Sequence, residues 1–242
     1  MRRALLVALC GLAGCGGDDE PRLVVSAASS MSDALSSCSR SFDGAEVRLS
    51  LAGSDELAAQ IRQGVKPDVY AAANTALPDE LHADGLLSKP VAFATNVLVI
   101  AVPAGSEVRE SADLGRQGMK VAIGSESVPV GSYTRELLER LPGGEGEPIL
   151  DNVRSNEPDV KGIVGKLSQG AADAGFVYAT DVTAAGDKLE AISLPPVVQP
   201  EVTYAAGVVR GAPRPDLARD FVAGLRDGPC ADALREAGFG TP

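Results

Sequence analysis

The chain has 242 residues, 45% of them hydrophobic, and a formal net charge of −11 at pH 7. This acidic balance argues against nucleic acid and anionic lipid surfaces as partners. The absence of Trp, with only five Phe and four Tyr, argues against a sugar site, where rings usually stack on aromatic side chains. The length is enough for one large domain or for two lobes, each with a substantial core.

The first residues have the features of a targeting segment. Two arginines precede an apolar stretch, residues 4–13, that is too short to span a bilayer, and a Leu-Ala-Gly-Cys sequence ends at Cys15. This tetrapeptide resembles the bacterial lipobox, so we expect residues 1–14 to be a lipoprotein signal peptide and Cys15 to be lipid-modified. Residues 15–21 would then be a tether that holds a body in the periplasm or extracellular space at the membrane. An ordinary secretory signal is the alternative.

A predicted strand gives way to a predicted helix at Ser30, and Ser30 with Asp33 has the spacing of a capping box. The first turn of a helix carries unpaired N–H groups and attracts anions. Similar strand-to-helix junctions recur at residues 51–54 and 121–131. We therefore expect several helix N-termini to form one oxyanion site that uses no basic side chain.

Short β-rich runs alternate with helical stretches along the chain, which is typical of an α/β fold with mainly parallel sheets. The predicted strands are Leu23–Ser26, Glu46–Leu51, Asp68–Ala72, Met119–Gly124, Ala174–Tyr178 and Leu189–Leu194. The predicted helices are Met31–Ser41, Asp55–Gln63, Leu77–Ala83, Ser132–Arg140, Asp159–Ser168, Thr180–Ala185, Pro215–Leu225 and Cys230–Ala237.

Two longer strand-like runs, residues 91–102 and 202–209, break this alternation. Each is long enough to leave one sheet and enter another, and together they bracket the middle of the chain. We interpret them as paired hinge crossings. The expected organisation is one lobe built from residues 22–95 plus 206–242 and a second lobe built from residues 96–205.

Two cysteines lie in the body of the chain, Cys38 in the first predicted helix and Cys230 in the last. An even pair in an exported protein suggests a disulfide, and two buried free thiols are the alternative. The single histidine, His82, lies near a predicted helix end. No spacing of His, Cys, Asp and Glu indicates a site for a free metal cation or a catalytic triad.

Five short segments, in this order, resemble the molybdate-binding proteins of bacterial ABC transporters. They are Ala27–Ala34, Leu57–Ile61, Pro67–Val69, Val128–Tyr133 and Ala174–Tyr178. The resemblance covers nearly all of the chain after the targeting segment. It implies a two-lobed fold of the type II periplasmic binding proteins, with each lobe a sheet flanked by helices.

In that family neutral hydrogen-bond donors hold a tetrahedral oxyanion between the lobes. The resemblance implies that the hydroxyl and amide groups of Ser30 and Ser54 donate from one lobe. It implies main-chain amides of Val130 and Val160, and the phenol of Tyr178, as donors from the other lobe. The ligand is then molybdate or tungstate bound as an oxyanion, with no cofactor and no chemical reaction.

The sequence departs from the family pattern at Asp55, where a small polar residue usually follows the second serine. An acidic side chain in the first helical turn favours the helix dipole and can point into solvent. If Asp55 instead faces the cleft, it would repel molybdate or accept a proton from an oxyanion such as hydrogen phosphate. Val130 stands where the family usually has alanine, a change that an amide donor tolerates.

The resemblance also implies an ABC permease as the partner that receives the ligand, and we expect the protein to be a monomer. Two alternatives stay open at this point. One is a binding protein for another oxyanion, sulfate or phosphate. The other is a dehydratase-like enzyme on the same fold, which would need an acid and base pair in the cleft that the sequence does not suggest.

Overall fold

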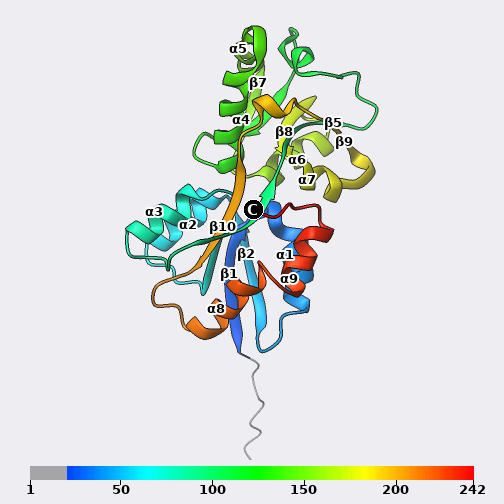
Figure 1. Cartoon of the computed structure of the whole chain (residues 1–242). Helices are drawn as coiled ribbons and strands as arrows, with labels where there is room; N and C mark the ends of the chain where they lie inside the picture. Colours follow the sequence, from blue (N-terminus) through cyan, green and yellow to red (C-terminus); the bar gives the residue numbers. More distant parts are fainter. Residues whose placement is uncertain (1–20) are drawn as a thin grey trace, which may run out of the picture.

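The computed structural model describes residues 21–242, and the predictions for the signal peptide, Cys15 and most of the tether lie outside these residues. The described chain forms two five-stranded sheets, one above the other in Figure 1, each flanked by helices. The α/β, two-lobed fold class expected from the sequence is confirmed. No helix in residues 21–242 is long and apolar enough to cross a membrane.

The first sheet has the strand order β2-β1-β3-β10-β4. Its strands are β1 (Arg22–Ala28), β2 (Glu46–Ala52), β3 (Val69–Ala72), β4 (Val91–Asn96) and β10 (Val202–Val208). Only β10 is antiparallel to its neighbours, so the other four strands run in one direction. The helices of this lobe are α1 (Ser32–Arg40), α2 (Ser54–Arg62), α3 (Ala76–Ala83), α8 (Pro215–Gly224) and α9 (Pro229–Glu236).

The second sheet repeats this plan with the order β7-β6-β8-β5-β9. Its strands are β5 (Leu98–Pro103), β6 (Val121–Gly124), β7 (Val153–Glu157), β8 (Ala174–Tyr178) and β9 (Leu189–Ile192). Here β5 is the antiparallel strand. The helices of this lobe are α4 (Pro129–Arg140), α5 (Gly146–Asp151), α6 (Val160–Ser168) and α7 (Ala179–Ala185).

The chain passes between the two sheets twice. The long run at residues 91–102 is split at Val97 into β4 of the first sheet and β5 of the second. The chain returns between Ile192 and Val202, and β10 pairs with β3 and β4 of the first sheet. The lobe boundaries expected at 95/96 and 205/206 stay predictions, because they concern which residues move together.

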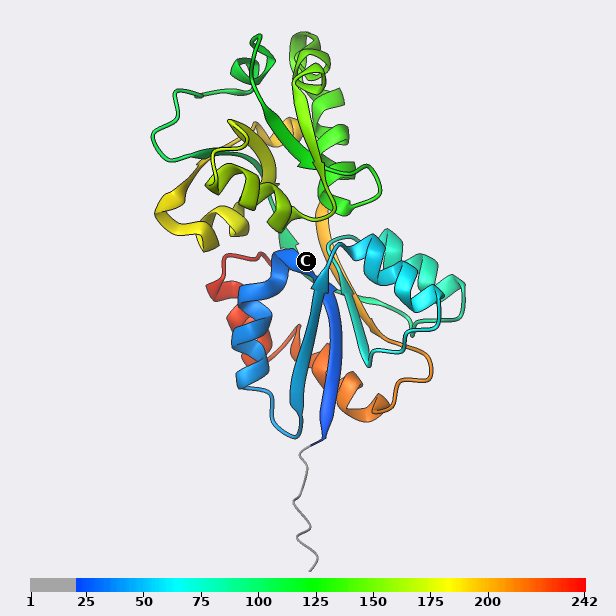
Figure 2. The ribbon, with the colours of Figure 1, turned by 180° about the vertical axis from the view of Figure 1, so that it is seen from behind.

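Strand β3, at the centre of the first sheet, is buried on both faces, and for this reason its sequence is apolar throughout. Side chains alternate between faces along a strand, so Val69 and Ala71 pack on one side while Tyr70 and Ala72 pack on the other. Helices α2 and α3 cover the latter side. Helices α1 and α9 lie side by side in both ribbon views (Figures 1 and 2).

A disulfide joins Cys38 on α1 to Cys230 on α9, with their Cα atoms 4.5 Å apart. The chain ends near the passage between the sheets, where Gly240 forms an antiparallel bridge with Thr95 (Figure 1). The two ends of the described chain are therefore both built into the first lobe.

The sequence patterns missed two elements and misplaced the start of a third. Strand β7 has the sequence Val-Arg-Ser-Asn-Glu and lies at a sheet edge, so it lacks the apolar run that marks a buried strand. The short helix α5 was also missed. Helix α4 begins at Pro129 rather than Ser132, because proline is well suited to the first helical position.

Candidate functional site

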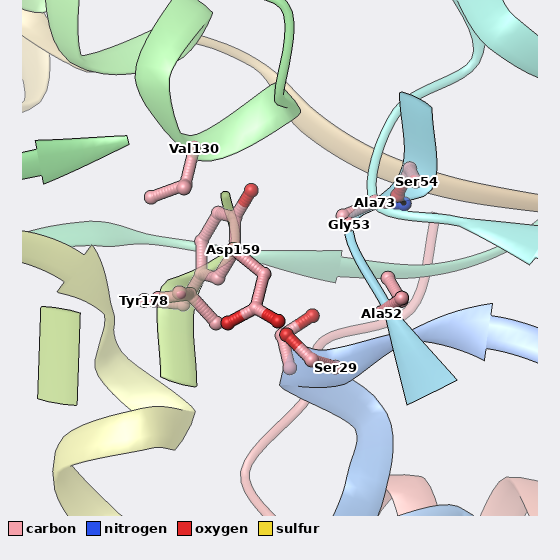
Figure 3. Close-up of a pocket in the computed structure, with 11 residues that line it drawn as sticks. Ser29, Ala52, Gly53, Ser54, Ala73, Val130, Asp159 and Tyr178 are labelled. Atoms are coloured by element: carbon pink, nitrogen blue, oxygen red, sulfur yellow. Dashed lines mark hydrogen bonds between the residues drawn. The ribbon is translucent and has the colours of Figure 1, made fainter. Parts of the chain in front are cut away.

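A small pocket lies between the two lobes and brings together all five residues expected to bind a ligand. Its empty volume is about 210 Å³. The lining residues are Ala28, Ser29, Ser30, Ala52, Gly53, Ser54 and Ala73 from the first lobe, and Val130, Asp159, Val160 and Tyr178 from the second. In Figure 3, Val130, Asp159 and Tyr178 lie on one side of this space, and Ala52, Gly53 and Ser54 lie on the other. The five expected residues thus share one location.

The pocket lies at the N-terminal ends of four helical segments. The 3₁₀ turn Ser29–Met31 follows β1 directly, and α2 begins at Ser54 directly after β2 and Gly53. From the facing lobe, α4 and α6 each contribute a residue of their first turn. First-turn N–H groups have no partner within their own helix and carry the positive end of its dipole. The convergence of helix starts that the sequence predicted is present.

The hydroxyl of Ser54 is held so that its proton is free. The amide of Ala73 donates to Ser54 Oγ over 3.1 Å. The phenol of Tyr70 donates to the Ser54 carbonyl oxygen over 2.7 Å, which fixes the backbone at this helix start. Because the Ser54 oxygen accepts here, its one proton is left to donate toward the pocket.

The capping box predicted at Ser30 and Asp33 is wrong. Ser30 lies inside the 3₁₀ turn, α1 begins two residues later, and its N-terminus has no side-chain cap. Ser30 Oγ instead lies 3.0 Å from the phenol oxygen of Tyr204 on β10, and the carboxylate of Asp33 lies 3.7 Å from Lys161 Nζ. The tight turn directs the Ser30 hydroxyl into the protein. Ser30 and Asp33 therefore have the spacing of a capping box without forming one.

The phenol of Tyr178 is buried at the end of β8, with 1% of the residue exposed, and its oxygen has no hydrogen-bond partner among residues 21–242. Burial raises the pKa of this phenol well above its ordinary value, so the group keeps its proton. A buried polar group without a partner costs free energy, and in native structures nearly all such groups meet a protein, water or ligand partner. Tyr178 therefore has a proton to donate into the pocket.

The two valines contribute main-chain groups. Val130 is the second residue of α4, and the next amide, that of Gly131, already donates to the Val128 carbonyl. Glycine is needed at 131 because a Cβ there would lie 2.0 Å from the Ser125 carbonyl oxygen. Val160 is the first residue of α6. First-turn amides such as these two can donate to a ligand in the pocket.

Asp159 is the one charged residue among those of residues 21–242 that line the pocket. It is the N-cap of α6, and its Oδ1 accepts from the Gly162 amide over 2.9 Å. This is the ordinary capping arrangement of an aspartate. No Lys, Arg or His is present among the lining residues that the structure describes. The donors that face the pocket are therefore neutral.

Lys161, which follows the lining residue Val160 in the chain, is directed to carboxylates outside the pocket lining. Lys161 Nζ lies 3.3 Å from Asp181 Oδ1, and Asp181 Oδ2 accepts from the Tyr178 amide over 3.3 Å. Burial raises the pKa of Asp181 to about 6, while the charge of Lys161 opposes this rise. Within residues 21–242, no group of three or more His, Cys, Asp or Glu is placed to hold a metal ion.

Asp55 does not line the pocket. Its Oδ2 accepts from the Ser127 hydroxyl over 2.6 Å, so the carboxylate connects α2 of the first lobe to the segment before α4 of the second. The lobes also meet closely at Gly53, where a Cβ would lie 2.5 Å from the carbonyl oxygen of Pro158. The side chain of Asp55, whose orientation the sequence left open, is thus directed toward the facing lobe.

Two residues next to the site were not singled out from the sequence. Tyr204 lies in β10, and its neighbours gave only the apolar signal of a buried strand. Asn96 is the last residue of β4, and its side-chain amide donates to Thr180 Oγ1 over 2.9 Å. The only feature of the sequence that could have pointed to Asn96 is that it is a polar residue within the apolar run 91–102.

The chain is similar to known proteins in three comparisons: with family models, with the sequences of curated proteins and with solved structures. A family model for bacterial extracellular solute-binding proteins matches residues 23–240. The molybdate-binding protein ModA of Mycobacterium tuberculosis H37Rv is 35% identical over 257 residues, covering 99% of this chain and 95% of the relative.

Two solved structures have the same fold. The substrate-binding domain of a proposed molybdenum ABC transporter from Clostridium difficile is 26% identical, with a TM-score of 0.69 and coverage of 91% of this chain and 99% of that one. The periplasmic molybdate-binding protein of Azotobacter vinelandii is 20% identical, with a TM-score of 0.82 and the same coverage, 91% and 99%. On the match to the family model and the identity to its M. tuberculosis relative, this chain belongs to the family of bacterial extracellular solute-binding proteins.

Proposed function

We propose that this protein binds molybdate, with tungstate as a second ligand, between its lobes and delivers it to an ABC permease. The observation that carries the proposal is the buried phenol of Tyr178, which has no partner in residues 21–242 and lines a pocket shared by both lobes. The names of the M. tuberculosis and A. vinelandii relatives support molybdate as the ligand.

The chemistry of the pocket suits a fully ionised dianion. Such an ion only accepts hydrogen bonds, and the groups proposed to meet it are hydroxyls and first-turn amides that donate. The proposed donors are Ser30, Ser54, Val130, Val160 and Tyr178. A hydrogen bond to a charged group is worth about 1.5–3 kcal/mol, so several together support tight binding without a basic side chain.

Among other oxyanions, phosphate loses one acceptor for its proton through the position of Asp55, and Asp159 is the carboxylate left in the pocket lining. Phosphate carries a proton near pH 7 and needs an acceptor, which Asp55 would supply only if its carboxylate faced the ligand. The carboxylate instead accepts from Ser127 outside the pocket lining. Sulfate has no such proton and is the closer competitor. Because the family consists of solute-binding proteins, an enzyme of the dehydratase kind is not favoured.

Three finer parts of this proposal rest on the sequence. They are a lipid anchor at Cys15, which lies outside the described residues, a monomeric state, and docking of the ligand-bound form onto the permease. The Leu-Ala-Gly-Cys sequence supports the anchor. Labelling with a fatty acid in a bacterial host, with Cys15→Ser as the control, tests it directly.

A thermal-unfolding series tests the ligand. Purified protein is heated with molybdate, tungstate, sulfate or phosphate in separate samples. A ligand at about a thousand times its dissociation constant adds roughly 4 kcal/mol of stability. For a chain of this size that is on the order of a 10 °C rise in the midpoint. A rise with molybdate and tungstate alone supports the proposal, and no rise with either refutes it.

A further inference from the structure

A chain of hydrogen bonds leads from the first crossing between the lobes to the hydroxyl of Ser30. Its members are Asn96 at the end of β4, Tyr204 on β10 and Ser30 in the turn after β1. Asn96 Nδ2 lies 3.4 Å from the Tyr204 oxygen, which lies 3.0 Å from Ser30 Oγ. Of these three residues, the family resemblance implied a role in ligand binding only for Ser30.

The direction of this chain is set at Asn96. Its Oδ1 accepts from the backbone amide of Val97 over 2.9 Å, and an amide N–H can only donate. The oxygen and nitrogen of the side chain are therefore not interchangeable here. With Oδ1 occupied in this way, Nδ2 supplies its two protons to Thr180 Oγ1 and to the phenol oxygen of Tyr204.

The direction passes next through Tyr204. The residue is fully buried, and burial raises the pKa of its phenol, so the group keeps its proton. A phenol that accepts from Asn96 has one proton left, and Ser30 Oγ is the partner within reach. Tyr204 therefore donates to Ser30, and the proton of Ser30 is left to point away from Tyr204.

The local backbone explains why Tyr204 can reach this position. The pairing of β10 with β4 shifts register between Tyr204 and Ala205, and such an irregularity redirects a side chain. The ring is then held edge to face by three aromatic neighbours, Phe93, Tyr178 and Phe239, at centroid distances of 5.3–6.2 Å. The phenol oxygen thus has little freedom to choose another partner.

We propose that Tyr204, directed by Asn96, is a positioning residue that fixes Ser30 as a hydrogen-bond donor to the bound oxyanion. This inference rests on the proposed function. The proton of Ser54 is available because its oxygen already accepts from Ala73, and Tyr178 has no other acceptor for its proton among residues 21–242. With Ser30 fixed in the same sense, the protons of all three hydroxyls are left for the ligand, which favours an oxyanion that only accepts hydrogen bonds.

A double-mutant cycle on molybdate affinity tests this role. Tyr204→Phe keeps the ring and removes only the hydroxyl. By calorimetric titration, we expect it to weaken molybdate binding about threefold to tenfold, the range of one neutral hydrogen bond. In a Ser30→Ala background the same change should cost less than twofold, because the hydroxyl that Tyr204 positions is gone. An equal loss in both backgrounds, or no loss in either, overturns the proposal.

A second measurement separates positioning from a general loss of structure. Competition with phosphate gives the ratio of molybdate to phosphate affinity, which should fall at least threefold in Tyr204→Phe because the Ser30 hydroxyl is then free to turn its proton away from the ligand and accept from it. Tyr70→Phe is the matched control, since Tyr70 is a buried phenol that contacts the Ser54 backbone. Its effect should be the same with and without the Ser30 hydroxyl. An unchanged ratio in Tyr204→Phe overturns the proposal.

Asn96→Asp provides a variant that reverses the chain rather than removing a link. A carboxylate at 96 would accept a hydrogen bond from the Tyr204 phenol, and Ser30 would then donate to Tyr204 instead of to the ligand. Molybdate affinity should fall more than in Tyr204→Phe, with part of the loss disappearing in the Ser30→Ala background. If the wild-type protein binds no molybdate, the first titration refutes the proposed function itself; if it binds and the cycles show no coupling, only the positioning role fails.

Discussion

Removal of the Tyr178 hydroxyl should have opposite effects on the ligand-free and ligand-bound protein. The residue is 1% exposed and its phenol oxygen has no partner in residues 21–242. An unsatisfied buried polar group costs about 1–3 kcal/mol. Tyr178→Phe removes that cost, while the ring keeps its edge-to-face contact with Tyr204 at 5.9 Å. The ligand-free unfolding midpoint should therefore rise by about 2–4 °C for each kcal/mol gained.

The same variant should bind molybdate more weakly. A hydrogen bond to a charged acceptor is worth about 1.5–3 kcal/mol, so its loss lowers affinity roughly tenfold to a hundredfold. Differential scanning calorimetry without ligand and titration calorimetry with molybdate measure the two effects. Tyr133→Phe is the control, because Tyr133 lies on α4 outside the pocket lining. A lower ligand-free midpoint together with unchanged affinity would refute the assignment of Tyr178 as a donor.

Three further predictions follow from contacts in the structure. Gly53→Ala places a Cβ 2.5 Å from a carbonyl oxygen of the facing lobe, so the two lobes should no longer be able to approach each other as closely at the pocket. Molybdate affinity should therefore fall at least tenfold in calorimetric titration. Gly165→Ala, with nothing within 4 Å, should leave affinity unchanged, and an equal loss in both would contradict this explanation. The pKa of Asp181 is raised by burial to about 6, so its ionisation opposes folding. The free energy of unfolding should therefore fall by roughly 2 kcal/mol between pH 4 and pH 6 on account of this group. Urea titrations should show no such fall in Asp181→Asn, and an unchanged pH profile would count against the buried charge. Reduction of the Cys38–Cys230 disulfide, which closes a loop of 192 residues, should lower the unfolding free energy by about 2–5 kcal/mol. Denaturant titrations with and without a reductant would disprove this if their midpoints coincide.

The sequence predicted the order of elements well because most of them are amphipathic or fully buried. The run at 91–102 indicated a passage between sheets, since no single strand needs that length, and the structure divides it at Val97. Strand β7 could not be found in this way. An edge strand that exposes alternate side chains needs no apolar pattern, and Val153–Glu157 has none.

The candidate site was predicted residue by residue, but the interactions that orient it were not. Short motifs placed Ser30 and Ser54 at helix starts, where local sequence decides the conformation. The partners of these hydroxyls come from far along the chain, as the 174 residues between Ser30 and Tyr204 show. Spacing rules such as the capping box describe only near neighbours, and for that reason Asp33 was given a contact that it does not make.

The position of β10 between β3 and β4 has a consequence for how the protein folds. All the strands of the second sheet lie within residues 98–192, so that sheet can assemble from one continuous segment. In the first sheet β4 has no neighbouring strand until residues 202–208 arrive, and β3 and β4 have unpaired edges in the meantime. Pairings of such long sequence separation form slowly, and unpaired edges favour aggregation. The lobe that provides Ser30 and Ser54 is therefore expected to be the last part of the molecule to form and the part most in need of protection before it does.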